Sequence, residues 1–380
     1  MATSIAIPQS MLPSDGRFGS GPSKIRSEQV DALQSAGRTV LGTSHRQAPV
    51  RQLVASIREG LADFFSMPED YEIVLGDGGA SAFWDIACAN LIRRTAACGS
   101  YGSFSAKFAQ SVASAPFLDD PAIFKSDPGS YRLPELTENA DAYCWAQNET
   151  STGVAAPVQR IAGSREQDAL IIVDATSGAG SLPVDVSQCD AYYFSPQKAF
   201  GSDGGLWLAA LSPAAIARAT GLADDAGCDG SPRWIPPFLS LRSAIENSRK
   251  DQTLNTPAIA TLIMLAEQVR WLNANGGLAW SSTRCAHSAN TLYAWAQGSD
   301  YAAPFVSDPA ARSNAVVTID LDEAVDASQV IAALRANGIV DTAGYRKLGR
   351  NQLRIGVFPA VEPDDVEALT HCIDYVVERL

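Results

Sequence analysis

Short apolar runs that lack polar alternation are the feature that most constrains the fold of this chain. Each run is five to seven residues long, and the runs occupy residues 71–76, 142–147, 169–174, 191–195 and 205–211. A strand with one face in water alternates apolar and polar side chains, whereas a strand covered by helices on both faces does not need to. The runs therefore predict an α/β fold built on a mainly parallel sheet.

Helical periodicity is found between these runs. Apolar residues recur at helical spacing over 49–65, where Pro49 suits the first turn of a helix. Residues 80–92 show the same spacing after the strand 71–76 and a glycine-containing turn at 77–79. This turn follows the carboxyl end of a strand, and open α/β sheets hold their ligands at that end. We therefore expect a ligand beside this turn.

A second group of elements follows residue 275. The helix expected over 257–274 ends at Asn275-Gly276-Gly277, a typical helix stop. Beyond it the pattern predicts helices over 278–297, 327–336 and 363–379 and strands over 314–321 and 352–357. We expect a large domain over 17–275 and a smaller α+β C-terminal domain over 276–380, with residues 1–16 packed on the smaller one and a cleft between the two.

Composition and charge exclude several classes of partner. The 42 Asp and Glu residues exceed the 29 Lys and Arg residues, so the formal net charge is −13 at pH 7. Such a chain repels nucleic acid and anionic membrane surfaces, and neither is expected as a partner. The longest stretches without Asp, Glu, Lys or Arg span 15 residues, at 252–266 and 285–299, and a membrane helix needs about 20 apolar residues.

The N-terminus and the cysteines indicate a cytoplasmic protein. The first fourteen residues contain no Lys or Arg, so no secretory signal is expected. The seven cysteines form no CxxC pair. We therefore expect neither a zinc or other metal site nor a disulfide framework.

Three features between residues 76 and 205 indicate a possible active site. Lys198 follows an aromatic run among small residues, and a lysine that is partly removed from water has the lowered pKa that suits Schiff-base chemistry. Asp174 ends the most apolar run, where a carboxylate can hold a ring nitrogen protonated. Gly79 and Ala80 lie where a helix start presents N–H groups to a phosphate. The alternatives are a solvated lysine, a turn or cap formed by Asp174 with Ser177, and an ordinary tight turn.

The order of glycine turn, aspartate and lysine resembles that of the pyridoxal-phosphate enzymes of the aspartate-aminotransferase fold (fold type I), in their class V branch. Nine segments spread over nearly the whole chain are similar to the phosphoserine aminotransferases of the actinobacterial type. These segments are 18–26, 42–50, 76–85, 101–109, 148–154, 173–180, 195–207, 255–262 and 345–366. The resemblance implies pyridoxal 5'-phosphate as the cofactor.

The resemblance assigns roles around the cofactor ring. Lys198 is implied to form the Schiff base and to move a proton between Cα and C4′ of the bound compounds. Asp174 is implied to pair with the pyridine nitrogen, and Thr150 to bond the phenolic oxygen. Phe104 occupies the position where many family members stack a tryptophan on the ring, which keeps the aromatic face and loses an indole N–H.

The resemblance also implies a shared phosphate site. Gly79, Ala80 and Gln197 are the implied phosphate contacts within one chain. Asn255 and Thr256 are implied to reach the phosphate of the partner subunit. The chain is therefore expected to form a homodimer with shared active sites.

Two windows without acidic residues indicate where anionic substrates bind. Residues 32–58 contain His45 and Arg46 in a predicted loop, and residues 342–361 contain four cations. Arginine suits two-pronged binding of carboxylate or phosphate. We predict His45, Arg46, Arg346 and Arg354 as substrate-binding residues.

The C-terminal window departs from the family pattern. Tyr345-Arg346 stands where the family has His-Arg, and Arg354 follows Arg346 by eight residues instead of six. Lys347 or Arg350 could therefore share the binding of substrate.

The resemblance implies reversible amino transfer between L-glutamate and 3-phosphohydroxypyruvate, which yields 2-oxoglutarate and O-phospho-L-serine in serine biosynthesis. Family members can also form 4-phosphohydroxy-threonine in pyridoxine biosynthesis. One alternative is another class V enzyme, such as alanine–glyoxylate aminotransferase or a cysteine desulfurase, for which Cys228 is the only loop cysteine. The non-enzyme alternative is a two-lobed solute-binding protein.

Overall fold

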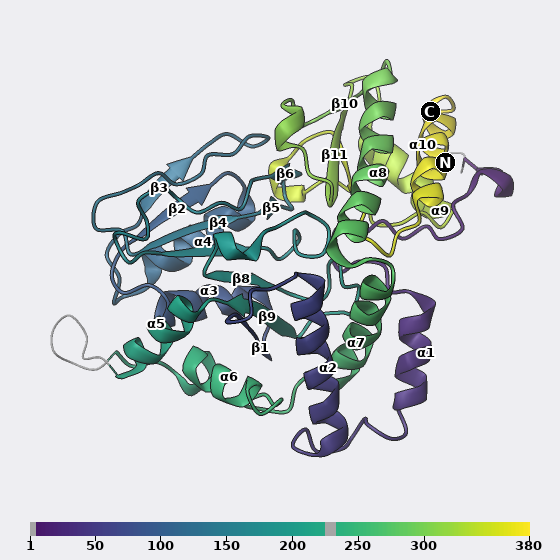
Figure 1. The fold of residues 1–380 in the computed structure, drawn as a ribbon. Coiled ribbons are helices and arrows are strands. Elements are labelled where there is room, and N and C mark those ends of the chain that lie inside the picture. Colours follow the sequence, from purple (N-terminus) through teal and green to yellow (C-terminus); the bar gives the residue numbers. More distant parts are fainter. Residues whose placement is uncertain (1–4, 225–232) are drawn as a thin grey trace.

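A seven-stranded sheet forms the centre of the computed structural model, which describes residues 5–224 and 233–380 (Figure 1). Its strands, in spatial order, are β1 (Glu72–Asp77), β9 (Leu206–Leu211), β8 (Ala191–Phe194), β7 (Leu170–Asp174), β4 (Ala142–Ala146), β2 (Ala96–Ser100) and β3 (Ala122–Lys125). The pairs from β8 to β3 are parallel, and β9 is antiparallel to both of its neighbours. The predicted α/β class with a mainly parallel sheet is confirmed.

The central strands supply two cores at once. Every residue of β4, β7, β8 and β9 is buried. In β7, Ile171 and Val173 join one core, while Leu170 and Ile172 join the other. Because side chains of a strand point alternately to its two faces, a strand with helices on both sides needs apolar residues at every position. This explains the runs without alternation.

Helices cover both faces of this sheet. The first core contains side chains of α2 (Ala48–Phe64) and α7 (Ile259–Ala274), and α1 (Ser27–Ala36) packs against α7. The helices of the second core are α3 (Ala80–Asn90), α4 (Ser103–Ser114), α5 (Pro213–Asp224) and α6 (Leu241–Ser248). The helices predicted over 49–65, 80–92 and 257–274 are α2, α3 and α7, whereas α1, α4, α5 and α6 were not predicted.

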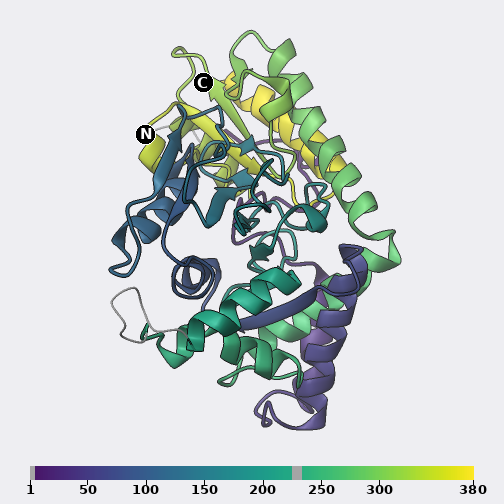
Figure 2. The ribbon, with the colours of Figure 1, turned by 60° about the vertical axis from the view of Figure 1, so that its left-hand side comes forward.

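A three-stranded antiparallel sheet lies at the C-terminal end of the chain. Its strands are β10 (Ala302–Pro304), β11 (Val316–Leu321) and β12 (Gln352–Gly356), and its helices are α8 (Gly277–Gly298), α9 (Ala327–Ala336) and α10 (Pro363–Val377). Figure 2 shows α8 and α10 side by side in the upper part of the molecule, and the start of α8 reaches down to α2 and α7. The exact division into domains at residue 275 stays a prediction.

The N-terminal residues contact this C-terminal group. The Ile7 N–H donates to Asn337 Oδ1 at 2.9 Å, and Ser14 Oγ donates to Asp365 Oδ1 at 2.7 Å. The remaining short elements are β5 (Asn148–Glu149), β6 (Val154–Ala155) and the 3-10 turns η1 (Gln9–Met11), η2 (Val186–Gln188), η3 (Pro237–Leu239), η4 (Pro309–Ala311) and η5 (Arg346–Leu348). Over the described ranges, no helix has both the length and the apolar character needed to cross a membrane.

Candidate active site

Lys198 lies just beyond the carboxyl end of β8, with its amine turned away from bulk water. Its Nζ donates to the carbonyl oxygen of Ser20 at 2.7 Å. Burial, together with the positive charge of Arg354, lowers the pKa of Lys198 to about 8, against a smaller raising effect of Asp174. A Cβ at position 21 would collide with this amine, and Gly21 has φ +129°. Only glycine leaves room for the lysine here.

Asp174 ends β7 and is 4% exposed. Its Oδ2 accepts from Trp84 Nε1 at 2.9 Å, and its Oδ1 accepts from the N–H of Thr176 at 2.9 Å and from the Thr176 hydroxyl. The alternative prediction made Asp174 a turn or cap residue with Ser177. The structure has a bond of this kind from Asp174 to the N–H of Thr176. The indole donor comes from α3, so a helix and a loop fix one carboxylate together.

Thr150 follows β5, and Phe104 lies near the start of α4. The two segments are in contact, because Glu149, beside Thr150, accepts from the N–H of Phe104. Thr150 Oγ1 is 2.6 Å from Ser177 Oγ, and the Thr150 carbonyl accepts from Arg354 Nη1 at 3.2 Å. Phe104 is in the first turn of α4, and its ring centroid lies 6.0 Å from that of Tyr345. Thr150 is therefore joined directly to a predicted substrate-binding arginine.

The start of α3 forms the predicted phosphate site. Gly79 is the N-cap residue with φ 109°. The Ala80 N–H already donates to Ser195 Oγ at 2.7 Å. The side-chain amide of Gln197 makes no hydrogen bond to a described residue, and its Oε1 is buried. A flip of this amide exchanges the positions of its O and N atoms. The side chain can therefore turn either its acceptor or its donor toward a ligand.

These residues fit pyridoxal phosphate. The chemistry requires an amine of lowered pKa, a carboxylate fixed in one orientation and polar groups that are left for a phosphate. Lys198, Asp174 and Gln197 meet the three requirements in this order. No group of three or more His, Cys, Asp or Glu side chains in residues 5–224 and 233–380 is arranged to hold a metal ion.

The predicted residues His45, Arg46, Asn255 and Thr256 form a second group. His45 Nδ1 lies 3.1 Å from Thr256 Oγ1, and Arg46 Nη1 donates to Gln252 Oε1 at 2.8 Å. Arg46, Asn255 and Thr256 are exposed. Burial and the charge of Arg46 lower the pKa of His45. Among the described residues, no hydrogen bond or ion pair joins this group to Lys198 or Asp174.

The four C-terminal cations lie in different surroundings. Arg354, in β12, is half-buried, its guanidinium lies 5.3 Å from the Tyr345 ring centroid, and burial lowers its pKa. Arg350 forms an ion pair with Asp320 at 2.5 Å, and its guanidinium lies 4.6 Å from the Phe305 ring centroid. Arg346 and Lys347 are exposed in η5. The structure therefore groups Arg354 with Lys198 and leaves Arg346 at the surface.

Several residues of the site were missed by sequence reasoning. Ser20, Gly21 and Trp84 contact Lys198 or Asp174 and were not singled out. Glu149 was missed as well, although its fully buried carboxylate accepts bonds from the first turn of α4. The only available signal was the position of Trp84, one helical turn after Ala80 on the predicted helix.

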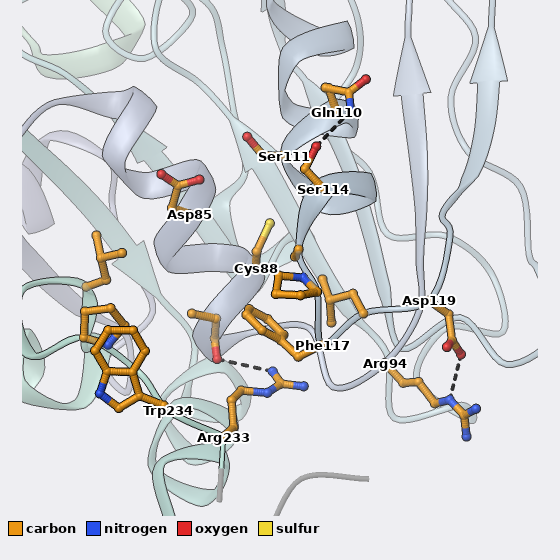
Figure 3. A pocket seen from close by; sticks show the side chains of 16 residues that line it. Asp85, Cys88, Arg94, Gln110, Ser111, Ser114, Phe117, Asp119, Arg233 and Trp234 are labelled. Carbon is orange, nitrogen blue, oxygen red and sulfur yellow. Dashed lines mark hydrogen bonds and ion pairs between the residues drawn. The ribbon is translucent and has the colours of Figure 1, made fainter. Parts of the chain in front are cut away.

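A separate cavity of about 880 Å³ lies between α3, α4 and the segment 233–239. Figure 3 shows Cys88, Phe117 and Trp234 in its wall, and an ion pair between Arg94 and Asp119 at its edge. None of the predicted site residues lines it. The volume of this cavity therefore says nothing about the chemistry of Lys198.

Replacing Trp84 with phenylalanine tests the orientation of Asp174. A hydrogen bond to a charged group contributes about 1.5–3 kcal/mol, and we expect Trp84→Phe to lower kcat and cofactor affinity about tenfold or more because Asp174 loses one donor. Both are measured by turnover and by absorbance titration with the cofactor. Trp295→Phe is the matched control, because Trp295 makes an equal 2.9 Å bond to Asp374 in another part of the chain. Equal effects of the two variants would contradict the prediction.

Comparisons with known proteins show the family of the chain. The Aminotransferase class-V family model matches residues 18–212. The phosphoserine aminotransferase of Rhodococcus opacus is 56% identical over 380 residues and the full length of both chains, and a relative from Mycobacterium avium, provisionally given the same name, is 58% identical over the same span.

Solved structures share the fold at low sequence identity. The phosphoserine aminotransferase of Cytophaga hutchinsonii superposes with a TM-score of 0.86 at 22% identity, over 95% of this chain and 99% of that one. The pyridoxamine-pyruvate aminotransferase of Mesorhizobium loti gives 0.81 at 18% identity, over 99% and 94%. The predicted aspartate-aminotransferase-like fold is thereby confirmed. Together with the family match, the full-length identity shows that the chain belongs to the class-V aminotransferases, which are pyridoxal-phosphate enzymes.

Proposed function

We propose that this chain is a phosphoserine aminotransferase, which exchanges an amino group between L-glutamate and 3-phosphohydroxypyruvate to give 2-oxoglutarate and O-phospho-L-serine. One observation carries the proposal: the charges of Asp174 and Arg354 act on the Lys198 amine in a chain that is 56% identical over its full length to a phosphoserine aminotransferase. The reaction belongs to serine biosynthesis.

The residues divide the work of the reaction. When bound, pyridoxal phosphate accepts the amino group and withdraws electrons from the substrate Cα. Lys198 takes a proton from Cα and returns one, and its pKa of about 8 lets the amine act as a base near neutral pH. The Ser20 carbonyl orients this amine. Asp174, fixed by Trp84 and Thr176, would pair with the ring nitrogen and keep it protonated.

Substrate binding needs two cationic places, because each amino donor carries an anion at both ends. Arg354 binds the α-carboxylate, since it lies beside Lys198 and is already oriented by Thr150 and Tyr345. The pair His45 and Arg46 binds the distal anion. The Thr256 hydroxyl lies beside the His45 ring. Thr256 is one of the two residues that the resemblance places at the partner's phosphate site.

We propose a homodimer, which this arrangement supports. His45, Arg46, Asn255 and Thr256 form one group on this chain, in which all members but the partly buried His45 are exposed, and among the described residues no hydrogen bond or ion pair ties them to the Lys198 group. In a dimer that shares its sites, this group completes the active site of the other subunit. We also propose the cytoplasm as the location, and 4-phosphohydroxy-threonine formation as a second activity in pyridoxine biosynthesis.

The main alternative is another class V activity. A desulfurase needs a reactive cysteine on a loop, and Cys228 lies outside the described residues. The six cysteines that the structure describes are all buried. Alanine–glyoxylate amino transfer needs only one carboxylate on the acceptor, and it would leave the cationic group at Arg46 without a role.

Comparison of amino donors tests the proposed function. Phosphoserine, serine and alanine are each supplied with 2-oxoglutarate, and glutamate formation is followed in a coupled assay. We expect kcat/KM for phosphoserine to exceed that for serine and alanine by about 100-fold or more, because the missing phosphate leaves Arg46 unpaired. Preference for alanine would contradict the proposal and favour the alternative.

The low pKa of Lys198 predicts how capture of the cofactor depends on pH. Only the neutral amine attacks the aldehyde, so the rate at which cofactor-free protein captures pyridoxal phosphate rises as Lys198 loses its proton, with a midpoint at its pKa of about 8. The rate is read from the absorbance of the product. Arg354→Gln removes a charge that lowers this pKa and shifts the midpoint to higher pH. A midpoint near the ordinary lysine value of 10.5 would show that the amine is solvated.

Shared active sites predict complementation between two inactive variants. Lys198→Ala lacks the amine, and the double variant Asn255→Ala, Thr256→Ala lacks the groups that are supplied to the partner. After the two are unfolded, mixed at equal amounts and refolded, half of the dimers are mixed and each contains one intact site, so about a quarter of wild-type activity returns. Either variant refolded alone is the control. No recovery from a mixture that forms dimers would contradict the shared site.

A further inference from the structure

A second, smaller cavity borders the candidate active site. Its volume is about 320 Å³. It is lined by residues 100–103, by residues 125, 126 and 128, by residues 151–152 and by Tyr345, Lys347 and Leu348. These segments directly flank Phe104, Thr150 and Arg346 in the sequence. The cavity is thus adjacent to the candidate site, and its residues carry none of the roles assigned above except the open assignment of Lys347.

The charge in this cavity is entirely positive. Lys125, at the end of the edge strand β3, and Lys347, in η5, are two of only six lysines in the chain, and both line it. No acidic side chain lines it. Neither lysine forms an ion pair with an acid in residues 5–224 or 233–380. In a chain of net charge −13, two unpaired lysines at one cavity are a local site for an anion.

Neutral donors surround the two lysines. Ser100, Ser103, Ser126 and Ser151 line the cavity together with Thr152. Thr152 is 1% exposed, and its Oγ1 has no hydrogen-bond partner. A buried hydroxyl without a partner is unusual in a folded protein, and a ligand is one of its explanations.

The nearby helix start cannot be the anion site. The buried Glu149 carboxylate already accepts from the N–H groups of Phe104 and Ser105 and from the hydroxyls of Ser105 and Ser151. Its negative charge occupies the positive end of α4. An anion in the cavity therefore depends on the lysines.

We propose that this cavity is an anion subsite that binds a phosphate group between Lys125 and Lys347. The phosphate is either that of the phosphorylated amino acid, which the two lysines would then hold in place of His45 and Arg46, or free inorganic phosphate. The first source rests on the proposed function, and the second does not. Lys125 ends a strand of the seven-stranded sheet, whereas Lys347 precedes β12 of the three-stranded sheet, so a bound phosphate links the two sheets.

The test measures binding and kinetics on the cofactor-loaded enzyme. Inorganic phosphate is titrated by calorimetry into wild type, Lys125→Ser, Lys125→Arg and the control Lys250→Ser, an exposed lysine outside the cavity. We expect Lys125→Ser to weaken phosphate binding about tenfold, Lys125→Arg to restore it because the charge is kept, and Lys250→Ser to have no effect. Melting temperatures show that the variants are folded.

Kinetics then separate the two sources of phosphate. A rise of KM for phosphoserine in Lys125→Ser, with KM for glutamate unchanged, identifies the phosphate of the substrate. Weaker phosphate binding with both KM values unchanged identifies free phosphate. Unchanged phosphate binding and unchanged KM values in folded Lys125→Ser would overturn the proposal. Absence of any phosphoserine turnover in wild type would overturn the proposed function alone, since the phosphate titration does not depend on turnover.

Discussion

A lysine amine withdrawn from water is the element on which the rest of the candidate site depends. Burial favours the neutral form of Lys198, and the positive charge of Arg354 acts in the same direction. The amine keeps one acceptor, the carbonyl of Ser20, and this close approach requires that residue 21 has no side chain. A chain segment near the N-terminus, a loop after β8 and a strand of the C-terminal sheet must therefore meet around one nitrogen atom.

The local placement of charged groups explains how a protein with an excess of acids can bind anionic substrates. The net charge of −13 is a property of the whole surface, whereas binding depends on the groups within a few ångströms. Acids near the site are already engaged: Asp174 by Trp84 and Thr176, and Glu149 by the first turn of α4. By contrast, Arg354, Arg46 and Lys125 form no ion pair with an acid in residues 5–224 and 233–380.

Sequence reasoning predicted the central fold well because burial on both faces leaves a clear mark. The runs at 169–174 and 191–195 are β7 and β8. Asp174 is the last residue of β7, and Lys198 follows the end of β8 by four residues, as the sequence predicted. Elements with weaker patterns were missed. β2 consists of small residues, and β3, at the edge, alternates between exposed and partly buried positions, so neither forms an apolar run. Ser20 and Trp84 were missed because their contacts join residues that are 178 and 90 positions apart.

The helix α8 belongs to two cores. Its first turns pack Leu278 and Trp280 against the core of the large sheet, and Ser281 donates to the carbonyl of Gly180, while Leu292 and Tyr293 lie in the core of the small sheet. Its 22 residues make a rod about 33 Å long. Its start follows Gly276 and Gly277, both with positive φ. Because Ser281 bonds to Gly180, in the loop after Asp174, this one helix connects the small sheet to the segment that follows the candidate carboxylate.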